Sequence, residues 1–437
     1  MRRWNLRKYG YILVWLALAG AVGLAWLLGR DSPPTAGEGE ASSSAAAPAP
    51  SEAEPSPDQE NLVGLWVPYF SLTTGENTQA AFQENYKAIV GQAKEVGVNA
   101  MFVHVRPFCD SLYPSEKFPW SHILTGEQGK DPGWDPLSFL VEYTHSQGME
   151  FHAWVNPLRV KTAQTPASLA PDNPYETWKA EHPYYFMEWE GSLYLDPAYP
   201  EVRSLIAQGV GEVVENYPVD GVHFDDYFYP SQSGELDEEA YALYTGNTAD
   251  PLPLLEWRQA NINTLVAECY QAVKQADVGA VFGISPQGNI ANDLAMGADV
   301  TEWAAVPGYV DYLCPQLYYS FENEALGYRE ALAQWEALPR HQGLSLYAGL
   351  ALYKAGTDAD NGTWLSQDNI IALQAQEAFA AGWQGVVLYS SDSLTAPAAQ
   401  AEVANAAALL GNRGQGARNR GKPPNEIVQA TENGPRR

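Results

Sequence analysis

Residues 200–230 read PEVRSLIAQGVGEVVENYPVDGVHFDDYFYP, a stretch in which one helix pattern is followed by one strand pattern. Pro200 suits the first turn of a helix, where its missing N–H is not needed. The second part, GVHFDDYFYP from Gly221, is a short apolar run that ends in polar and aromatic residues, which is typical of a buried strand. The stretch therefore predicts one helix followed by one strand. The apolar residues of the helix fall on one stripe: Val202, Leu205, Ile206, Val210, Val213, Val214 and Tyr217.

Similar apolar runs recur from Leu65 to Tyr389, and helical patterns at 81–96, 136–147, 253–274 and 370–381 separate several of them. Only the crossover at 288–310 is short and irregular. Eight strands that alternate with helices predict an α/β fold, a (β/α)8 TIM-type barrel whose active site lies at the carboxyl ends of the strands. The expected strands are GLWVPYF from Gly64, NAMFVHVRPF from Asn99, MEFHAWVNP from Met149, GVHFDDYFYP from Gly221, AVFGISPQG from Ala280, VDYLCPQLYYSF from Val310, LYAGLALYK from Leu346 and GVVLYSSD from Gly385.

The first 30 residues differ in character from this region. Arg2, Arg3, Arg7 and Lys8 precede an uncharged run from Tyr11 to Leu28, which as a helix would be roughly 27 Å long and could just cross a bilayer. This pattern favours an uncleaved transmembrane anchor, and a cleaved signal peptide is the alternative. The basic flank predicts that everything beyond Arg30 lies outside the cytoplasm.

Composition divides the remainder of the chain. Residues 31–60 consist mainly of Ala, Ser, Pro, Gly and acids and are expected to form a disordered tether. Residues 61–410 form the predicted barrel domain, and residues 411–437 a disordered basic tail. Within 61–410, 14 Lys or Arg stand against 44 Asp or Glu, a net charge of −30, which argues against nucleic acid as a partner.

No redox, nucleotide-binding or serine-hydrolase motif is present, so we expect no cofactor and no metal. We expect the three cysteines to behave as ordinary small apolar residues and not to form a disulfide framework. Three of the few basic residues, Arg106, Arg159 and Lys354, follow expected strands and suggest a local site for a carboxylate. Salt bridges to neighbouring loop acids are the alternative.

Aromatic side chains are abundant at the same strand ends, among them Trp154, Tyr227, Tyr318 and Tyr353. Each ring alone could serve in packing. Together with nearby amides and the acids Asp225 and Asp226 they suggest a carbohydrate subsite. The amides in question are Asn156, Gln287 and Gln316.

Long ordered strings of this sequence resemble the glycoside-hydrolase-like 10 family of bacterial envelope proteins. They include NAMFVHVRPFCDSLYPS, DPGWDPLSFLVEYTHSQGMEFHAWVNPLRV, YPVDGVHFDDYFYP and FGISPQG, and the likeness spans about residues 61–392. The resemblance implies a barrel enzyme, and the peptidoglycan-active members of the family cleave glycan strands that lack stem peptides. With the predicted anchor, it implies a location on the outer face of the bacterial membrane, or secretion if the anchor is cleaved. The site residues that the resemblance implies are Asp225, Asp226, His152, Asn156, Arg159, Gln287, Gln316 and Tyr318.

The adjacent acids set a geometric condition on any mechanism. Side chains alternate along a strand, so Asp226 faces the same site as Asp225 only if the strand twists or ends there. If both converge, one should have a raised pKa, as an acid catalyst needs. Adjacency then suits substrate assistance by a 2-acetamido group, with Asp226 as the acid and Asp225 as the residue that orients the amide or acts as nucleophile.

Two alternatives stay open. HFDD superficially resembles a motif of polysaccharide deacetylases, and His104, His152 and His223 lie on three successive expected strands, where they could hold a zinc ion. A wall-binding protein that has kept the groove and lost catalysis is the other alternative. The sequence leaves the oligomeric state, the cleaved linkage and the stereochemistry open.

Overall fold

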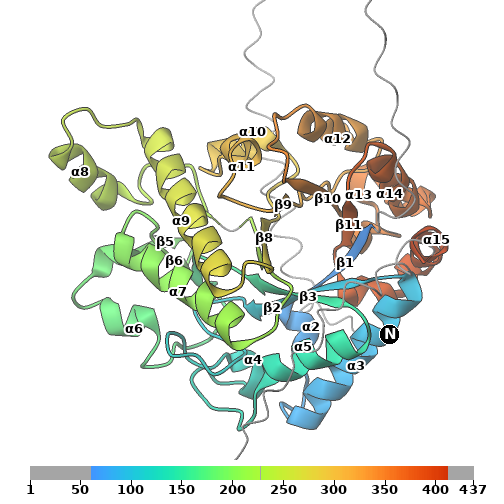
Figure 1. The fold of residues 1–437 in the computed structure, drawn as a ribbon, viewed down its shortest axis with the longest axis horizontal. Helices are drawn as coiled ribbons and strands as arrows, with labels where there is room; N and C mark the ends of the chain where they lie inside the picture. The colour runs from blue at the N-terminus through green and yellow to red at the C-terminus, as the bar shows by residue number, and fades with distance from the viewer. Residues whose placement is uncertain (1–60, 227, 412–437) are drawn as a thin grey trace, which may run out of the picture. The chain divides into compact units, whose positions relative to one another are not determined.

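The computed structural model of the protein describes residues 61–226 and 228–411. Eight parallel strands close into a barrel in the spatial order β1-β2-β3-β7-β8-β9-β10-β11 (Figure 1). Each of the eight expected strands overlaps one of these, which confirms the barrel. The strands are β1 (Leu62–Val67), β2 (Ala100–Arg106), β3 (Glu150–Val155), β7 (Gly221–Phe224), β8 (Val281–Ile284), β9 (Tyr312–Leu313), β10 (Ser345–Leu350) and β11 (Gly385–Leu388).

The five expected amphipathic helices are present in the layer around the barrel. They are α3 (Gln79–Val96), α5 (Pro136–Ser146), α7 (Pro200–Asn216), α9 (Leu254–Ala276) and α14 (Ile370–Ala380). The Thr78 hydroxyl caps α3 by accepting the Ala81 N–H, and Gly97 ends it with a left-handed backbone. The irregular fifth crossover contains only the short helices α10 (Ile290–Ala295) and α11 (Val300–Ala305). The other helices are α2 (Tyr69–Leu72), α4 (His122–Thr125), α6 (Pro174–Trp178), α8 (Glu238–Asn247), α12 (Tyr328–Glu336), α13 (Ala359–Ser366) and α15 (Gln400–Leu410).

A three-stranded antiparallel sheet between β3 and α7 was not expected from the sequence. It contains β4 (Arg159–Lys161), β6 (Ser192–Leu195) and β5 (Phe186–Trp189), in that spatial order. Its strands have three or four residues, too few for an alternating pattern to be recognised. Because the insertion leaves the carboxyl end of β3, it starts at the mouth of the barrel, and β4 carries Arg159.

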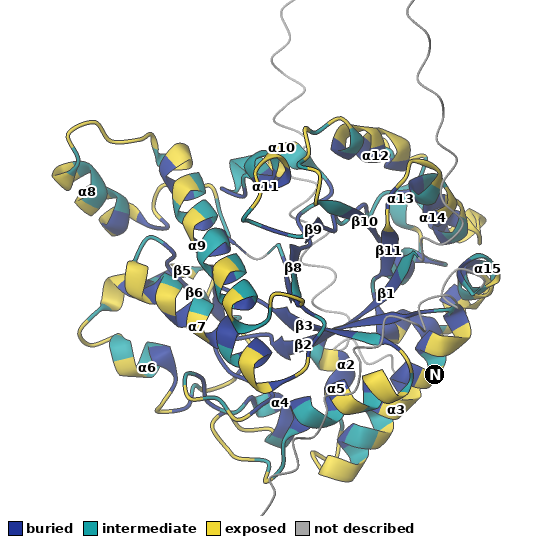
Figure 2. Ribbon diagram, viewed as in Figure 1, coloured by how far each residue is buried: buried dark blue, intermediate teal, exposed yellow. Residues whose placement is uncertain are grey.

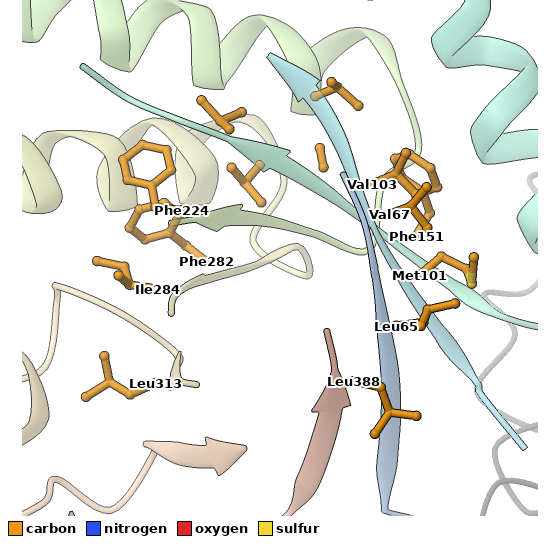
Figure 3. Packing of buried hydrophobic residues seen from close by; sticks show 14 of the residues in the cluster. Leu65, Val67, Met101, Val103, Phe151, Phe224, Phe282, Ile284, Leu313 and Leu388 are labelled. Atoms are coloured by element: carbon orange, nitrogen blue, oxygen red, sulfur yellow. The ribbon is translucent and has the colours of Figure 1, made fainter. Parts of the chain in front are cut away.

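Alternate strand residues build two distinct packing layers. Outward-facing side chains such as Leu65, Val103 and Phe282 pack against the helices (Figure 3), and the strands are buried while the outer helix faces are exposed (Figure 2). The inside of the barrel is aromatic and includes Phe102 and Tyr312. A side chain at Gly283 would meet the Tyr312 ring at 2.2 Å, so glycine makes room for the tyrosine.

The predicted anchor at 11–28, the tether at 31–60 and residues 412–437 of the tail lie outside the described residues. In the part of the chain that the structure describes, no helix is both long and apolar enough to span a membrane.

Candidate active site

The two adjacent acids lie just beyond the carboxyl end of β7. This strand ends at Phe224, whose ring packs outward at 4.9 Å from that of Phe282, while His223 faces the inside of the barrel. Because the regular strand has ended, alternation no longer forces Asp225 and Asp226 to opposite sides. Asp225 is a buried residue, whereas Asp226 is partly exposed.

Three neighbouring strands contribute to the hydrogen bonds around Asp225. Its Oδ1 accepts the backbone N–H of Asp226 at 2.9 Å and the side-chain N–H of Gln316 at 3.2 Å. The same Gln316 nitrogen donates to the carbonyl oxygen of Ser285 at 3.0 Å. Ser285 directly follows β8 and Gln316 lies three residues beyond β9. The Gln316 carboxamide is therefore held between the end of β8 and Asp225.

Burial controls the charge of this pair. Burial first, and then the negative charge of Asp226, raise the pKa of Asp225 well above its usual range. Burial also raises the pKa of Asp226, although contacts with Asp225 and Gln316 and the charge of Arg159 partly offset it. Two carboxylates this close in a buried site do not both ionise readily. The two carboxyls therefore titrate together, and a proton that they hold belongs to the pair rather than to one residue.

Arg159 brings the positive charge that acts on the pair. Its Nε donates to the carbonyl oxygen of Pro107 at 3.0 Å, and its guanidinium lies 5.0 Å from the Phe108 ring centroid. The Asn156 amide donates to the same Pro107 oxygen at 3.2 Å. This shared acceptor places Asn156 and Arg159 side by side. The positive charge of Arg159 offsets a small part of the rise in the pKa of both acids.

The structure places Arg106 elsewhere, which corrects the expectation of three clustered basic residues. The β2–β3 register shifts between His104 and Arg106, so Arg106 turns outward. Its guanidinium lies 4.4 Å from the Phe118 ring centroid and against Gly209 of α7. Lys354 forms a salt bridge with a neighbouring acid, which was the alternative expectation. Its Nζ lies 3.4 Å from Asp360 and donates to the Tyr318 carbonyl at 2.7 Å.

His152 and Trp154 lie deeper in the barrel than the sequence suggested. His152 pairs in register with Gly221, the first residue of β7, and its ring stacks on Phe102 at 4.4 Å. Trp154 is 3% exposed and stacks on His104 at 3.5 Å, so neither ring face is open to a sugar. The physical reason is strand register: both residues precede the level at which β7 ends.

The three interior histidines do not converge on one point. The Trp66 indole can only donate, so His223 Nε2 accepts its N–H at 3.0 Å and Nδ1 carries the proton toward the Tyr312 hydroxyl at 2.9 Å. Burial lowers the pKa of His223 and of His104 well below the usual range, which keeps both rings neutral. His152 instead lies near Glu150, at 3.3 Å.

Three tyrosine rings form one wall of the mouth. The Tyr318 centroid lies 5.7 Å from that of Tyr353 and 5.9 Å from that of Tyr389. Tyr318 and Tyr353 are half-buried, and burial together with nearby groups that include Asp225 raises the pKa of Tyr318. Tyr389 was not among the expected site residues, although alternation from Val387 along β11 could have found it. The Tyr389–Ser390 peptide bond is cis. Tyr227 lies outside the described residues.

Sequence reasoning also missed Asp293. This residue lies on α10, is 2% exposed, and accepts the backbone N–H of Gln287 at 2.9 Å. Burial raises the pKa of Asp293 well above its usual range, and the charge of Asp226 adds to the shift. Gln287 is half-buried, and its backbone pairs with that of Gln316. A search for acids restricted to strand ends cannot find a helical residue that turns back toward the mouth.

Known proteins are similar to this domain in sequence or in fold. A family described as "Glycosyl hydrolase-like 10" matches residues 62–366. Glycosyl hydrolase YngK of Bacillus subtilis is 37% identical over 264 residues, which cover 56% of this chain and 51% of YngK. Glycosyl hydrolase DigH of Escherichia coli is 34% identical over 287 residues, which cover 60% of this chain and 64% of DigH. The chain thus spans between half and two thirds of the length of these relatives.

Two solved structures are similar in fold. The glycoside hydrolase domain of PgaB (BpsB) from Bordetella bronchiseptica has a TM-score of 0.53 and 14% identity, over 79% of this chain and 98% of that domain. The catalytic domain of β-amylase from Paenibacillus polymyxa has a TM-score of 0.53 and 10% identity, over 82% of this chain and 99% of that domain. At such low identity these likenesses show the barrel fold alone.

Proposed function

Because the chain belongs to the glycosyl hydrolase-like 10 family, we propose that its barrel hydrolyses N-acetylated bacterial cell-wall glycan, namely peptidoglycan strands that lack stem peptides. The observation that carries the proposal is the adjacent pair Asp225 and Asp226 at the end of β7, where the Gln316 amide donates to Asp225 and the charge of Arg159 acts on both acids. The tyrosine wall at Tyr318 supplies rings beside it. The names of the relatives, both glycosyl hydrolases, agree with this chemistry.

Adjacency of the two acids favours a substrate-assisted mechanism. Hydrolases that use two protein carboxyls place them about 5–5.5 Å or roughly 6.5–9.5 Å apart, on either side of the scissile bond. In our proposal the 2-acetamido oxygen of the sugar attacks the anomeric carbon while Asp225 orients the amide N–H. Asp226, the more exposed acid, gives its proton to the leaving oxygen. Water then opens the cyclic intermediate and returns a proton to Asp226.

Hydrolysis can be tested directly with the full chain in detergent and glycan strands stripped of stem peptides, following new reducing ends by mass spectrometry. We expect products of even sugar number from the wild type and a loss of at least 100-fold in Asp225→Asn and Asp226→Asn, since general acid catalysis contributes about 10²–10⁴-fold. Acetate release without new reducing ends would instead support a deacetylase. Glycan binding without any product would support a binding protein.

Arg159 should select for the acid sugar of the glycan. Removal of stem peptides exposes a lactyl carboxylate, which a guanidinium binds through charge-assisted hydrogen bonds. We therefore expect Arg159→Ala to raise KM about tenfold or more for stripped peptidoglycan strands and much less for neutral chitin oligomers. Arg329→Ala is a matched control, because Arg329 is exposed and pairs with Glu377. An equal rise in KM for both substrates in Arg159→Ala would mean that Arg159 has a structural role and does not bind the carboxylate.

We also propose that the apolar run at 11–28 anchors the protein, with the barrel on the extracytoplasmic face of the membrane. The uncharged run and the basic flank before it support this proposal. Membrane fractionation of cells, followed by protease treatment of intact spheroplasts, tests it. Recovery of the chain in the soluble fraction at full length would contradict the anchor.

A further inference from the structure

Asp293 is a buried carboxyl that is only half satisfied. Its Oδ1 accepts the Gln287 N–H at 2.9 Å, whereas its Oδ2 is buried without a hydrogen-bond partner among the described residues. The side chain is 2% exposed. A buried polar atom without a partner lowers the free energy of unfolding. Asp293 therefore destabilises the fold through its Oδ2 while it accepts only one backbone N–H through its Oδ1.

The N–H that Asp293 accepts belongs to the segment that holds Gln316. Gln287 and Gln316 pair across the extensions of β8 and β9, and the Gln316 N–H donates to the Pro286 carbonyl at 2.9 Å. The Gln316 side chain donates to the Ser285 carbonyl at 3.0 Å. Residues 285–287 therefore fix both the backbone and the carboxamide of Gln316.

This segment has little freedom to move. A side chain at Gly288 would lie 2.3 Å from the Gln316 carbonyl oxygen, which shows how closely the two backbones approach. On its other side the Trp335 indole donates to the Gly288 carbonyl at 3.1 Å. Asp293 and Trp335 thus clamp the segment at successive residues, Gln287 and Gly288.

We propose that Asp293 is a positioning residue of the site. Through the Gln287 N–H it fixes the strand-end segment that aims the Gln316 carboxamide at Asp225, whose Oδ1 lies 3.2 Å away. The catalytic consequence rests on the proposed glycan hydrolysis. The positioning role does not rest on glycan hydrolysis, because it concerns only the contact between Gln316 and Asp225.

Glu402 provides a matched control. It is also 2% exposed, accepts the backbone N–H of Ile371, and has its second carboxyl oxygen buried without a partner among the described residues. Burial raises its pKa, as for Asp293. Glu402 lies on α15 and holds the start of α14, in the outer helix layer, so it shares the energetics of Asp293 but not its place at the mouth.

The first test compares Asp293→Leu, Asp293→Asn and Glu402→Leu in the full chain, on stripped glycan strands. We expect Asp293→Leu to lower kcat at least tenfold with KM within about threefold of wild type. Asp293→Asn, which keeps an oxygen acceptor, should restore most of the lost kcat, and Glu402→Leu should change kcat less than twofold. In a Gln316→Ala background, Asp293→Leu should cause no further loss. Equal kcat in the two leucine variants, or additive losses with Gln316→Ala, would overturn the proposal.

A second test does not depend on hydrolysis. Carboxyl-labelled aspartate NMR follows the titration of Asp225 in the full chain in detergent. The Gln316 N–H favours the charged form of Asp225, so its misplacement in Asp293→Leu should raise the pKa of Asp225 relative to Glu402→Leu. An unchanged titration would overturn the positioning role, even in a wild type that cleaves glycan. Absence of cleavage by the wild type, with a shifted titration, would reject only the proposed function.

Discussion

At the scale of single residues, the local environment gives aspartates of this chain opposite properties. Burial raises the pKa of Asp225, and the charge of Asp226 raises it further. Asp220 is also partly desolvated, but hydrogen bonds from His145 and from the Phe151 N–H outweigh burial and lower its pKa. Asp225 is buried beside a second carboxyl, whereas Asp220 is less buried and accepts a hydrogen bond from a histidine. Asp225 therefore titrates above its usual range, while Asp220, which accepts the Phe151 N–H, joins β3 to β7.

The raised pKa of Asp225 predicts that the site weakens the fold at neutral pH. An acid whose folded pKa exceeds its unfolded value adds stability below the unfolded pKa, near 4, and loses it as pH rises toward the folded pKa. Asp225→Asn removes this titration. We expect the variant to gain stability relative to wild type as the pH rises from 4 to 7. Urea unfolding at pH 4 and pH 7 checks this, and an advantage that does not grow with pH would contradict it.

Asp196 gives a second pH-dependent prediction, away from the pair. Burial raises its pKa to about 7, despite the hydrogen bond that it accepts from the Ala198 N–H at 2.9 Å. Wild-type stability should therefore fall between about pH 4 and pH 7, by at most about 1.4 kcal/mol per pH unit for this group. The difference in Tm between Asp196→Asn and wild type should grow through that range and level off above it. A constant difference from pH 5 to pH 8 would show that Asp196 does not titrate there.

At the scale of elements, helix α7 shows how closely the barrel and its outer layer fit. Gly209 and Gly211 lie two residues apart on this helix, and both are buried. A side chain at Gly209 would meet the Arg106 guanidinium at 2.3 Å and the Phe118 ring at 2.4 Å, whereas one at Gly211 would lie 3.8 Å from the Ala272 methyl group. Only glycine fits at position 209, because Arg106 and Phe118 approach its backbone closely. Position 211 has room for a methyl group.

The two glycines predict stability changes of opposite sign. Gly209→Ala should destabilise the protein by about 1–3 kcal/mol, because its methyl group would overlap the buried Arg106 guanidinium and Phe118 ring. Gly211→Ala should stabilise it by roughly 0.5–1 kcal/mol, since alanine loses less backbone entropy in a helix and its methyl group makes an ordinary contact. Urea denaturation of both variants gives the comparison. Two changes of the same sign would contradict the packing described here.

At the scale of the whole molecule, charge is the dominant feature. The barrel domain at 61–410 carries a net charge of −30, with 14 basic residues for 44 acidic ones, so most acids have no cationic partner. Like charges at this density repel one another across the surface and oppose the folded state. In such an acidic domain the charge of Arg159 matters to the electrostatics of the site, because it is one of few positive charges and acts on Asp225 and Asp226.

Added salt should therefore stabilise this protein. Raising NaCl from 20 mM to 500 mM shortens the Debye length from roughly 20 Å to about 4 Å and screens the repulsion. We expect Tm to rise by several degrees over this range in scanning calorimetry, with most of the gain below 200 mM. A matched series in sucrose, which does not screen charge, serves as the control. A fall in Tm with NaCl would mean that ion pairs such as Arg258 with Asp237 dominate.

The barrel can be predicted from the sequence alone. Its eight apolar runs, its helical stripes and the acids at the end of the fourth run depend on local periodicity, which is readable from a single chain. It also brought Asp225, Asp226 and Gln316 to the same end of the barrel, because parallel strands share one carboxyl edge.

The direction in which side chains turn beyond the ends of the regular strands depends on long-range packing. The register shift in β2 sent Arg106 outward, and strand register put His152 below the mouth. The turn of α10 brought Asp293 back toward the mouth, where it accepts the Gln287 N–H. These placements depend on strand stagger and on contacts between residues far apart in the chain. Periodicity within one segment carries no information about either.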